Sequence, residues 1–528
     1  MSQKLVTFSG GGWNSLSALY GMTAGALDAL EQRGETRDLS NLFANTDAIA
    51  GNSGGTWALT TLASSNAINT ALQSQSGTDA ITSSGFLGQV REAFERLPQF
   101  GRSNSVEPFM LSLLSGRNGL DFNWEKLVQN LVYAPAKDVP DGQFTPGSLT
   151  SWAQNKHLIF AAGLGAIKAR NVFDRALPPQ PMIVARSRNL SPINNNIESA
   201  ARANNIPNEA QVIPLSIELN NNAESNSLFR VTGAGSNDAR VDFNSTLFFR
   251  SSSTPIPSKG DASQLPLTSP SVYSSAALAA FSNALTTRNA DKLAPMVSLT
   301  QQGLKNYPQT PLTRREKDAH IAATKLGLAR TMDGFYIDNS AIAFGLSALH
   351  SDRGLDDNFQ ISAFINTSNQ QSDWVNIDLD NGETLKLPYS ITMLFGVDQD
   401  GTPLPESDGY PIPSLPFTFT QPNAVVFNRD SLTGIPADPN WSYESSDSDW
   451  RLEQRTINVT TQENETFNIS DDKNGILNLF IYSNPSSETI AFNNNILDQY
   501  DENFNGYREA LNSPTGEALI ANAFAFNY

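Results

Sequence analysis

The N-terminal part of the chain alternates twice between a short apolar run, a glycine-rich turn and a helical pattern. Leu5–Phe8 is a β-rich run closed by Gly10–Gly12, and apolar residues then recur at helical spacing across Leu16–Leu30. Ala48–Ala50 leads in the same way into Gly51–Gly55 and a second helical pattern. Because successive β-turn-α units place their strands side by side, this pattern predicts a largely parallel sheet with helices on its faces.

The rest of the chain adds strands to this plan and becomes richer in β-structure toward its end. Further strands are predicted at residues 181–185, 212–217, 246–249, 424–427 and 477–482, and a helical pattern at residues 274–285. Beyond about residue 355 the pattern indicates β-hairpins, with turn signals at 380–382 and 398–401.

We therefore predict an α/β fold with a central mixed β-sheet flanked by helices and a β-rich C-terminal half. The chain is expected to form a single catalytic domain over residues 1–528, with its core motifs in 5–355 and the β-rich part in 356–528. A separate C-terminal binding module is the structural alternative.

Composition excludes several classes of protein. The chain has no cysteine, which rules out disulfide scaffolds, cysteine-ligated metals and thiol catalysis. Its 35 basic and 53 acidic residues give a formal net charge of −18, which argues against a nucleic-acid partner. The N-terminus lacks a secretory pattern, and no apolar run reaches the ~20 residues that cross a bilayer. A cytoplasmic or peripheral membrane location is expected.

The segment Gly51–Gly55 satisfies the pattern G-x-S-x-G between an apolar strand and a helix. A serine on such a sharp turn is forced toward strained dihedrals and projects its hydroxyl outward, while the glycines let neighbouring backbone approach. The helix that follows directs its N-terminal N–H groups at a developing oxyanion. The pattern thus indicates Ser53 as a nucleophile; a helix-capping serine in a glycine-rich turn is the alternative.

The turn Gly10–Gly12 strengthens the catalytic interpretation. Acyl transfer requires preorganised backbone donors where negative charge develops, and residues without side chains allow such donors to point inward. A phosphate-binding turn is the alternative, although neither the G-x-G-x-x-G pattern nor the G-K-[ST] of a P-loop is present.

A serine nucleophile also requires a base within hydrogen-bond reach. None of the three histidines, His157, His320 and His350, lies in a triad pattern. A carboxylate can serve instead if burial raises its proton affinity. Asp333, at an Asp-Gly turn, is the best candidate, with Asp338 as a nearby competitor; an ordinary turn residue is the alternative for Asp333.

Together these segments resemble the catalytic domain of cytosolic phospholipase A2 and, more distantly, the patatin-like acyl hydrolases. Ser9–Trp13 resembles that family's oxyanion-hole turn. Ser53–Trp57, followed by Thr60–Leu62, is similar to its nucleophile turn and first helical turns. Asp333, with Asn339 downstream, resembles its catalytic-aspartate segment. The matches occur in the family's order, which makes them more specific together than singly.

The resemblance implies a Ser-Asp dyad that cleaves fatty-acyl esters of phospholipids or lysophospholipids. Ser53 would attack the acyl carbonyl, Asp333 would take its proton, and the N–H groups of Gly11 and Gly12, with Gly54, would hold the oxyanion. The chemistry needs no metal and no cofactor. The expected partners are a lipid substrate and, transiently, a membrane or micelle surface, while the oligomeric state stays open.

Two features qualify these expectations. Where the family has an arginine thought to engage the lipid phosphate, this chain has Asn14, a substrate-binding candidate that leaves the head group open. An esterase or acyltransferase acting on other esters, or a non-catalytic lipid-binding protein, is therefore an alternative. The segment 398–401 has a weak likeness to a calcium loop but lacks the remaining ligands, so it is expected to be a hairpin turn.

Several apolar residues lie in the region that follows the second helical pattern. They are candidates for a lid or a membrane-inserting surface, with ordinary core packing as the alternative. These residues are Phe94, Leu97, Phe100, Phe109, Met110 and Leu113.

Overall fold

The computed structural model describes residues 2–74, 81–82, 85–95, 124–167, 209–220, 227–231, 259–261, 265–276, 331–379, 381–404, 410–411, 418–421, 423–445, 450–464, 466–484 and 494–525.

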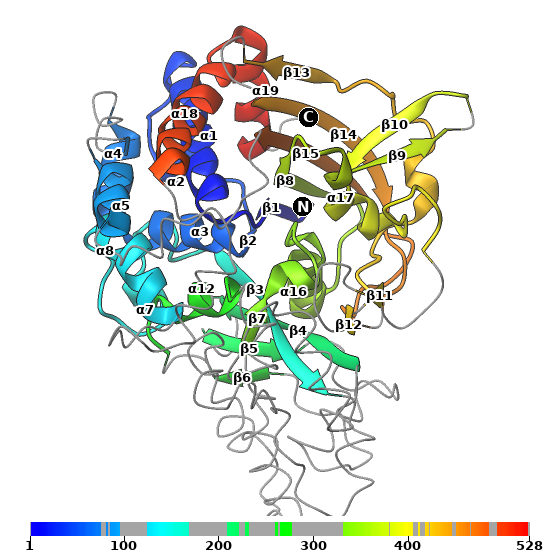
Figure 1. Ribbon diagram of the computed structural model, residues 1–528, viewed down its shortest axis with the longest axis horizontal. Helices are drawn as coiled ribbons and strands as arrows, with labels where there is room; N and C mark the ends of the chain where they lie inside the picture. The colour runs from blue at the N-terminus through cyan, green and yellow to red at the C-terminus, as the bar shows by residue number, and fades with distance from the viewer. Residues whose placement is uncertain are drawn as a thin grey trace, which may run out of the picture.

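Strands from both halves of the chain join one mixed sheet (Figure 1). Its strands are β1 (Lys4–Phe8), β2 (Ala48–Asn52), β3 (His157–Ile167), β4 (Glu209–Leu219), β5 (Ser227–Val231), β6 (Lys259–Asp261), β7 (Thr331–Asp333), β8 (Phe359–Ser368), β11 (Tyr410–Pro411), β12 (Thr418–Gln421), β13 (Trp441–Glu444), β14 (Arg451–Thr460) and β15 (Asn474–Asn484). Over the described residues, the main path runs β11-β12-β4-β3-β2-β1-β8-β15-β14-β13. On one side β7 pairs with β3, and β5 links β4 to β6.

The centre of this sheet is parallel. β1 pairs in parallel with β2 and β8, β2 with β3, and β8 with β15. Antiparallel partners flank this centre, because β4 and β7 run against β3 and β14 runs against β15. The parallel centre brings the C-terminal ends of β1 and β2 to one edge, from which two turns lead into helices.

The helices are α1 (Gly12–Gln32), α2 (Leu39–Leu42), α3 (Gly54–Ser64), α4 (Asn66–Gln73), α5 (Phe86–Glu95), α7 (Trp124–Val128), α8 (Ala134–Ala136), α12 (Ser269–Ser274), α16 (Ile342–Arg353), α17 (Tyr389–Thr392), α18 (Asn494–Leu511) and α19 (Pro514–Ala525). Short 3-10 or π turns are η3 (Gln129–Tyr133), η4 (Pro146–Ser148), η6 (Gly334–Tyr336), η7 (Gln371–Asp373), η8 (Met393–Phe395) and η9 (Arg429–Leu432). None of the helices described is both long and apolar enough to cross a membrane.

Helices cover both faces of the sheet. On β1, Leu5 lies against Gly345 of α16, where a Cβ would overlap the leucine side chain. Phe8 faces the other way, because side chains alternate along a strand. It contacts Phe364 of β8, which stacks on Phe524 of α19 at a ring-centroid distance of 5.1 Å. α16 and α19 therefore lie on opposite faces, and Figure 1 shows α19 grouped with α1 and α18, apart from α16.

The predicted fold class is confirmed. The sheet is mixed, helices flank it, and β8, β14 and β15 supply strands from the C-terminal half. The strands predicted at 212–217 and 477–482 lie within β4 and β15. Asn381 and Gly382, the described part of the turn predicted at 380–382, lie between β9 (Trp374–Asp378) and β10 (Thr384–Pro388), which form a small antiparallel sheet of their own.

One sequence expectation is wrong, and a second is wrong at its start. The run 424–427 is buried but is not a strand: only Phe427 makes an isolated bridge, to Thr461. The helical pattern assigned to 274–285 begins where a helix ends, because α12 stops at Ser274.

At 398–401 the chain forms the expected turn, since the Asp398 N–H donates to the Thr402 carbonyl oxygen at 2.8 Å.

Other sequence predictions lie outside the described residues: the strands at 181–185 and 246–249, the part of the predicted helix after residue 276, and the apolar candidates at 97, 100, 109, 110 and 113. Phe94 falls within α5, and its side chain is also outside the described part.

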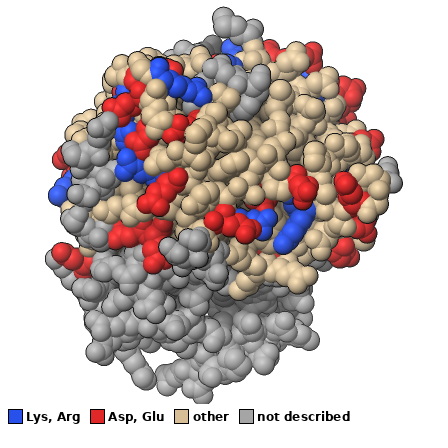
Figure 2. Space-filling model, turned by 90° about the horizontal axis from the view of Figure 1, so that it is seen from above, with Lys and Arg blue, Asp and Glu red and all other residues tan. Residues whose placement is uncertain are grey.

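The described surface reflects the acidic composition of the chain. Figure 2 shows acidic side chains scattered over one face, some at its edge and some near its middle beside the fewer basic ones, with a broad uncharged area between them. The charge is therefore dispersed on this face rather than gathered into one field.

Candidate active site

The nucleophile candidate occupies a strained turn between β2 and α3. Ser53 has φ 47° and ψ −121°, a conformation that side chains rarely adopt. The turn is tightly packed: a Cβ on Gly54 would overlap the backbone of Gly12, and one on Gly55 would overlap the carbonyl oxygen of Phe8. The two glycines that follow Ser53 thus allow the second turn to pack directly on the first.

The first turn, between β1 and α1, lies beside Ser53. Gly11 and Gly12 have φ values of 141° and 56°, which only glycine adopts readily. A Cβ on Gly10 would come within 3.0 Å of the Ser53 Cβ. Among the described residues, no acceptor takes a hydrogen bond from the N–H groups of Gly11, Gly12 or Gly54. Three backbone donors without described partners therefore adjoin the Ser53 turn.

Asp333 ends β7 and meets Ser53 through the sheet. β7 pairs with β3, placing Asp333 opposite Ala162, while Ala161 pairs with Asn52 at the end of β2. The Ser53 hydroxyl donates to Asp333 Oδ2 at 2.8 Å, although 280 positions separate the two in sequence. The other oxygen, Oδ1, accepts the Phe335 N–H at 2.9 Å. The structure thus brings the two predicted dyad residues into direct contact.

Burial sets the proton affinity of Asp333. Its side chain is 1% exposed, and burial raises the pKa of its carboxyl to about 7, against the lowering effect of hydrogen bonds from Phe335 and Ser53. No ion pair with a basic side chain of the described residues offsets this burial. A carboxyl with a pKa near 7 can accept and release a proton at neutral pH.

Asp338, the local competitor, serves another purpose. Its carboxylate accepts hydrogen bonds from the N–H groups of Ser340 at 2.9 Å and Ala343 at 2.7 Å, at the start of α16. The next residue, Asn339, ties the segment to both turns: its carbonyl oxygen accepts the Gly10 N–H, and its side chain accepts the Asn52 amide.

Asn14 does not join this group. Its side chain is buried within α1, and its Oδ1 accepts a hydrogen bond from Asn503 of α18 at 3.4 Å. This contact suits packing between two helices rather than the substrate contact expected from the sequence.

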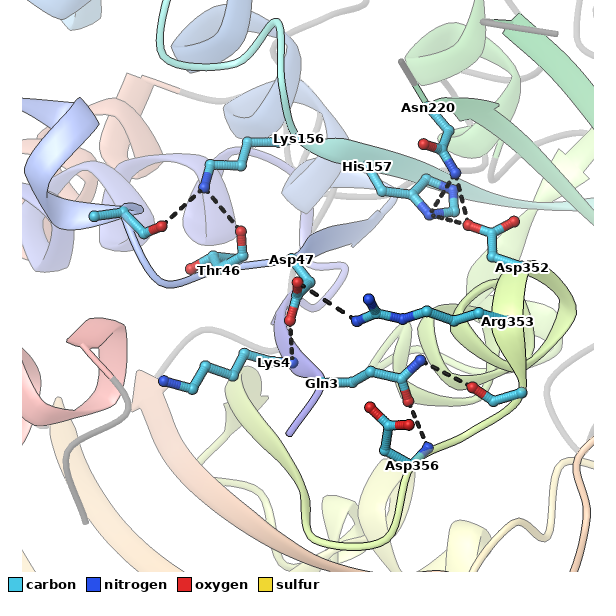
Figure 3. A network of polar contacts seen from close by, with 12 residues as sticks. Gln3, Lys4, Thr46, Asp47, Lys156, His157, Asn220, Asp352, Arg353 and Asp356 are labelled. Atoms are coloured by element: carbon cyan, nitrogen blue, oxygen red, sulfur yellow. Dashed lines mark hydrogen bonds and ion pairs between the residues drawn. The ribbon is translucent and has the colours of Figure 1, made fainter. Parts of the chain in front are cut away.

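The described histidines also lie elsewhere. His157, at the start of β3, is buried between Glu218 of β4 and Asp352 of α16, at 3.0 and 3.1 Å. Figure 3 shows His157 with Asp352 and Asn220; nearby, Arg353 contacts Asp47, and Lys156 donates to the Thr46 carbonyl oxygen. His350 lies in the last turn of α16, and His320 is outside the described residues.

Sequence reasoning missed Ser274, the last residue of α12. Its hydroxyl accepts the Ser53 N–H at 3.0 Å and donates to the Ala161 carbonyl oxygen. Ser274 is one of several serines in Ser269–Ser275, and no motif distinguishes it from the others.

Comparison with known proteins fits this geometry. Residues 5–88 match the lysophospholipase catalytic domain family. The resemblance inferred from sequence is confirmed over this segment, which contains both glycine turns and Ser53 and ends before Asp333.

A similar solved structure is that of human GIVD cytosolic phospholipase A2, with 13% identity and a TM-score of 0.28. The similarity covers 69% of this chain and 45% of that chain, so the chain spans less than half the length of that protein. No curated protein sequence matches the chain.

Proposed function

We propose that this chain is a serine acyl hydrolase that cleaves fatty-acyl esters of phospholipids or lysophospholipids through a dyad of Ser53 and Asp333. The observation that carries the proposal is the 2.8 Å hydrogen bond from the Ser53 hydroxyl to a buried carboxylate. The lysophospholipase family match over residues 5–88 supports the lipid substrate class.

In the first half of the reaction, Ser53 Oγ attacks the acyl carbonyl carbon and its proton passes to Asp333 Oδ2. The negative charge that develops on the carbonyl oxygen is stabilised by the N–H groups of Gly11, Gly12 and Gly54. The ester C–O bond then breaks, Asp333 returns the proton to the leaving alcohol, and the acyl group stays on Ser53. This requires a base that titrates near neutral pH, which agrees with the raised pKa of Asp333, about 7.

In the second half, water replaces the alcohol. Asp333 takes a proton from the attacking water, whose oxygen bonds to the acyl carbon. The same glycine donors hold the second oxyanion. The protonated Asp333 carboxyl then gives its proton to Ser53 Oγ as the bond between Oγ and the acyl carbon breaks, which releases a fatty acid and restores the starting state. Every step uses side chains and backbone groups of this chain, without metal or cofactor.

We further propose that residues 1–528 form one catalytic unit that acts at a membrane or micelle surface. Strands on both sides of residue 356 share the central sheet, which supports one unit over a separate C-terminal binding module. An esterase or acyltransferase on non-phospholipid esters is the second candidate, because Asn14 stands where an arginine would engage a phosphate and is itself bonded to Asn503.

Product analysis on a mixed lipid panel tests the proposal. The panel contains phospholipids, lysophospholipids and neutral glycerol esters, and mass spectrometry follows the free fatty acids and acyl-transfer products. Ser53→Ala is expected to lower product formation by at least about 10³-fold. Ser17→Ala is a matched control, since it removes another buried hydroxyl, which donates to the Asn14 carbonyl oxygen on α1.

The outcomes separate the candidates. Cleavage of phospholipids or lysophospholipids that Ser53→Ala abolishes supports the proposal, whereas cleavage confined to neutral esters favours the second candidate. A fluorophosphonate probe distinguishes the non-catalytic alternative: a folded wild-type protein that binds lipid but never becomes labelled on Ser53 would refute hydrolysis.

A further inference from the structure

Ser274 links the nucleophile turn to the sheet. It is fully buried, its hydroxyl accepts the backbone N–H of Ser53 at 3.0 Å, and it donates to the carbonyl oxygen of Ala161 on β3. Asn52, just before Ser53, still pairs with Ala161 in the parallel sheet. The Ser274 hydroxyl therefore bridges the Ser53 N–H, just after the end of β2, and the Ala161 carbonyl oxygen on the neighbouring strand β3.

This position matters because Ser53 is strained. Its φ of 47° departs from the extended conformation of β2, so the turn has to be held by its surroundings. Removing the hydroxyl would leave the buried Ser53 N–H without its acceptor, which costs free energy and favours relaxation of the turn. Relaxation would move Oγ relative to Asp333 and the glycine donors, and small displacements of reacting atoms carry large rate penalties.

The same short segment also contacts the proposed base. The Asp333 N–H donates to the Ala276 carbonyl oxygen at 3.3 Å, two residues after Ser274. Ala161, which accepts from Ser274, precedes Ala162, the partner of Asp333 in the pairing of β3 with β7. One end of α12 thus holds the backbone of the nucleophile by a side chain and that of the base by a carbonyl group.

We propose that Ser274 is a positioning residue that fixes the strained turn of Ser53 so that its hydroxyl points at Asp333. This inference rests on the proposed function. It also assigns the oxyanion donors: the Ser53 N–H is taken by Ser274, so the oxyanion is held by Gly11, Gly12 and Gly54.

Steady-state hydrolysis of p-nitrophenyl butyrate, a water-soluble acyl ester, tests this role. Ser274→Ala is expected to lower kcat by about 10- to 100-fold while KM changes less than about threefold, because the change affects the geometry of reaction rather than the binding of the acyl group. The rate of fluorophosphonate labelling is expected to fall in parallel. Ser274→Thr, which retains the hydroxyl, is expected to restore most of kcat.

Ser271→Ala is the matched control. Ser271 is also fully buried on α12, but its hydroxyl donates to the Thr268 carbonyl oxygen and contacts Tyr133 rather than Ser53. Its kcat is expected to stay within about threefold of wild type. If circular dichroism shows that Ser274→Ala does not fold, kcat is measured for Ser274→Cys instead. This variant keeps the volume but offers only a weak acceptor, so its kcat is also expected to fall.

The outcomes also separate this inference from the proposed function. A wild-type protein that neither hydrolyses the ester nor becomes labelled refutes the function itself. A wild-type protein that depends on Ser53, together with wild-type kcat in Ser274→Ala or Ser274→Cys, refutes only the positioning role. Equal losses of kcat in Ser271→Ala and Ser274→Ala would also refute it, since the effect would then be general to α12.

Discussion

Strand β3 borders two clusters of ionisable groups. Each contains a buried carboxylate, but only one of these carboxylates has a basic side chain beside it. Near the start of the strand, Glu218 and Asp352 hold His157 between them. Near its middle, Ala162 pairs with Asp333, whose carboxylate has a serine hydroxyl and a backbone N–H as its hydrogen-bond donors. Glu218 and Asp333 are both buried, so the difference between them lies in the charge beside each carboxylate.

The pKa values follow from that difference. Burial lowers the pKa of His157, but the hydrogen bonds and charges of Asp352 and Glu218 outweigh burial, so the pKa is raised. For Asp333, burial raises the pKa to about 7 and the two hydrogen bonds offset only part of the effect. A buried carboxylate beside a basic side chain therefore forms an ion pair, whereas a buried carboxyl without one titrates near neutral pH.

The largest expected effect breaks the Asp333 side of the comparison. Asp333→Asn removes the base but keeps the side-chain shape, and hydrolysis of p-nitrophenyl butyrate is expected to fall by about 10²- to 10⁴-fold. The free energy of unfolding at pH 8 should rise, because a neutral amide replaces a carboxylate buried without a counter-charge.

The sign of that stability change follows from linkage. The folded-state pKa of Asp333, about 7, lies above the ordinary aspartate value of 3.8, so the folded protein loses stability as pH rises between these values. The advantage of Asp333→Asn should therefore grow from pH 4 to pH 7 and level off above it. Urea unfolding across this range measures it, and a large loss of stability at pH 8 would contradict the assignment.

Breaking the ion pair at the other cluster should have the opposite consequence. Glu218→Gln leaves buried His157 with one carboxylate, and a loss of about 3 kcal/mol in the free energy of unfolding is expected at pH 6. Because the folded-state pKa of His157 is raised above 6.5, its contribution is full below pH 6.5 and is lost as pH rises through the folded pKa.

Urea unfolding at pH 6 and pH 9 checks this prediction, and the loss should be smaller at pH 9. Asp357→Asn is the control, since Asp357 is an exposed carboxylate 3.6 Å from Lys473 and should contribute less than about 1 kcal/mol. Equal losses for Glu218→Gln at the two pH values would show that the imidazolium charge is not what the cluster stabilises.

The pH dependence of hydrolysis sharpens the same contrast. The value of kcat/KM is expected to rise about tenfold per pH unit at low pH and to level off around pH 7, as the carboxyl of Asp333, with a pKa of about 7, becomes ionised. Glu218→Gln, measured alongside, should leave this midpoint in place. A midpoint that moves with Glu218 would remove Asp333 as the titrating base, and a midpoint near pH 4 would contradict the raised pKa of Asp333.

Sequence reasoning reached the local parts of the fold and site. The turns Gly10–Gly12 and Gly51–Gly55 are each specified within a few residues, because glycine content, an apolar strand and a helical pattern occur together. The run 424–427 shows where this fails: its buried apolar residues read as a strand, yet the N–H groups of Val426 and Phe427 both donate to the Leu394 carbonyl oxygen. The apolar residues of this run correctly predicted its burial but not the partner of its backbone hydrogen bonds.

Contacts set by the tertiary fold were less accessible. Asp333 could be named only through its turn and the family resemblance, because its contact with Ser53 depends on the pairing of β7 with β3. Ser274 and the cluster around His157 had no signal at all: their partners come from distant strands and helices, and a lone serine or histidine in a sequence carries no record of what lies beside it. The family resemblance implied a histidine-free dyad, which stays a prediction, and the sequence carried no sign of the contacts around it.

The smallest expected effect concerns a third buried carboxylate, Asp338, which lies in the same segment as Asp333. Burial raises its pKa to about 6, while hydrogen bonds from Ser340, Ala343 and Ala341 lower it. Asp338→Ala removes these acceptors from the first turn of α16 and should cost about 1 to 2 kcal/mol in the free energy of unfolding. The rate of ester hydrolysis should fall less than about tenfold, and Asp338→Asn, another good capping residue, should recover most of the stability. A rate loss for Asp338→Ala as large as that of Asp333→Asn would contradict this assignment. It would mean that a carboxylate bound by N–H groups at a helix terminus can also be catalytic, and that the two aspartates act together.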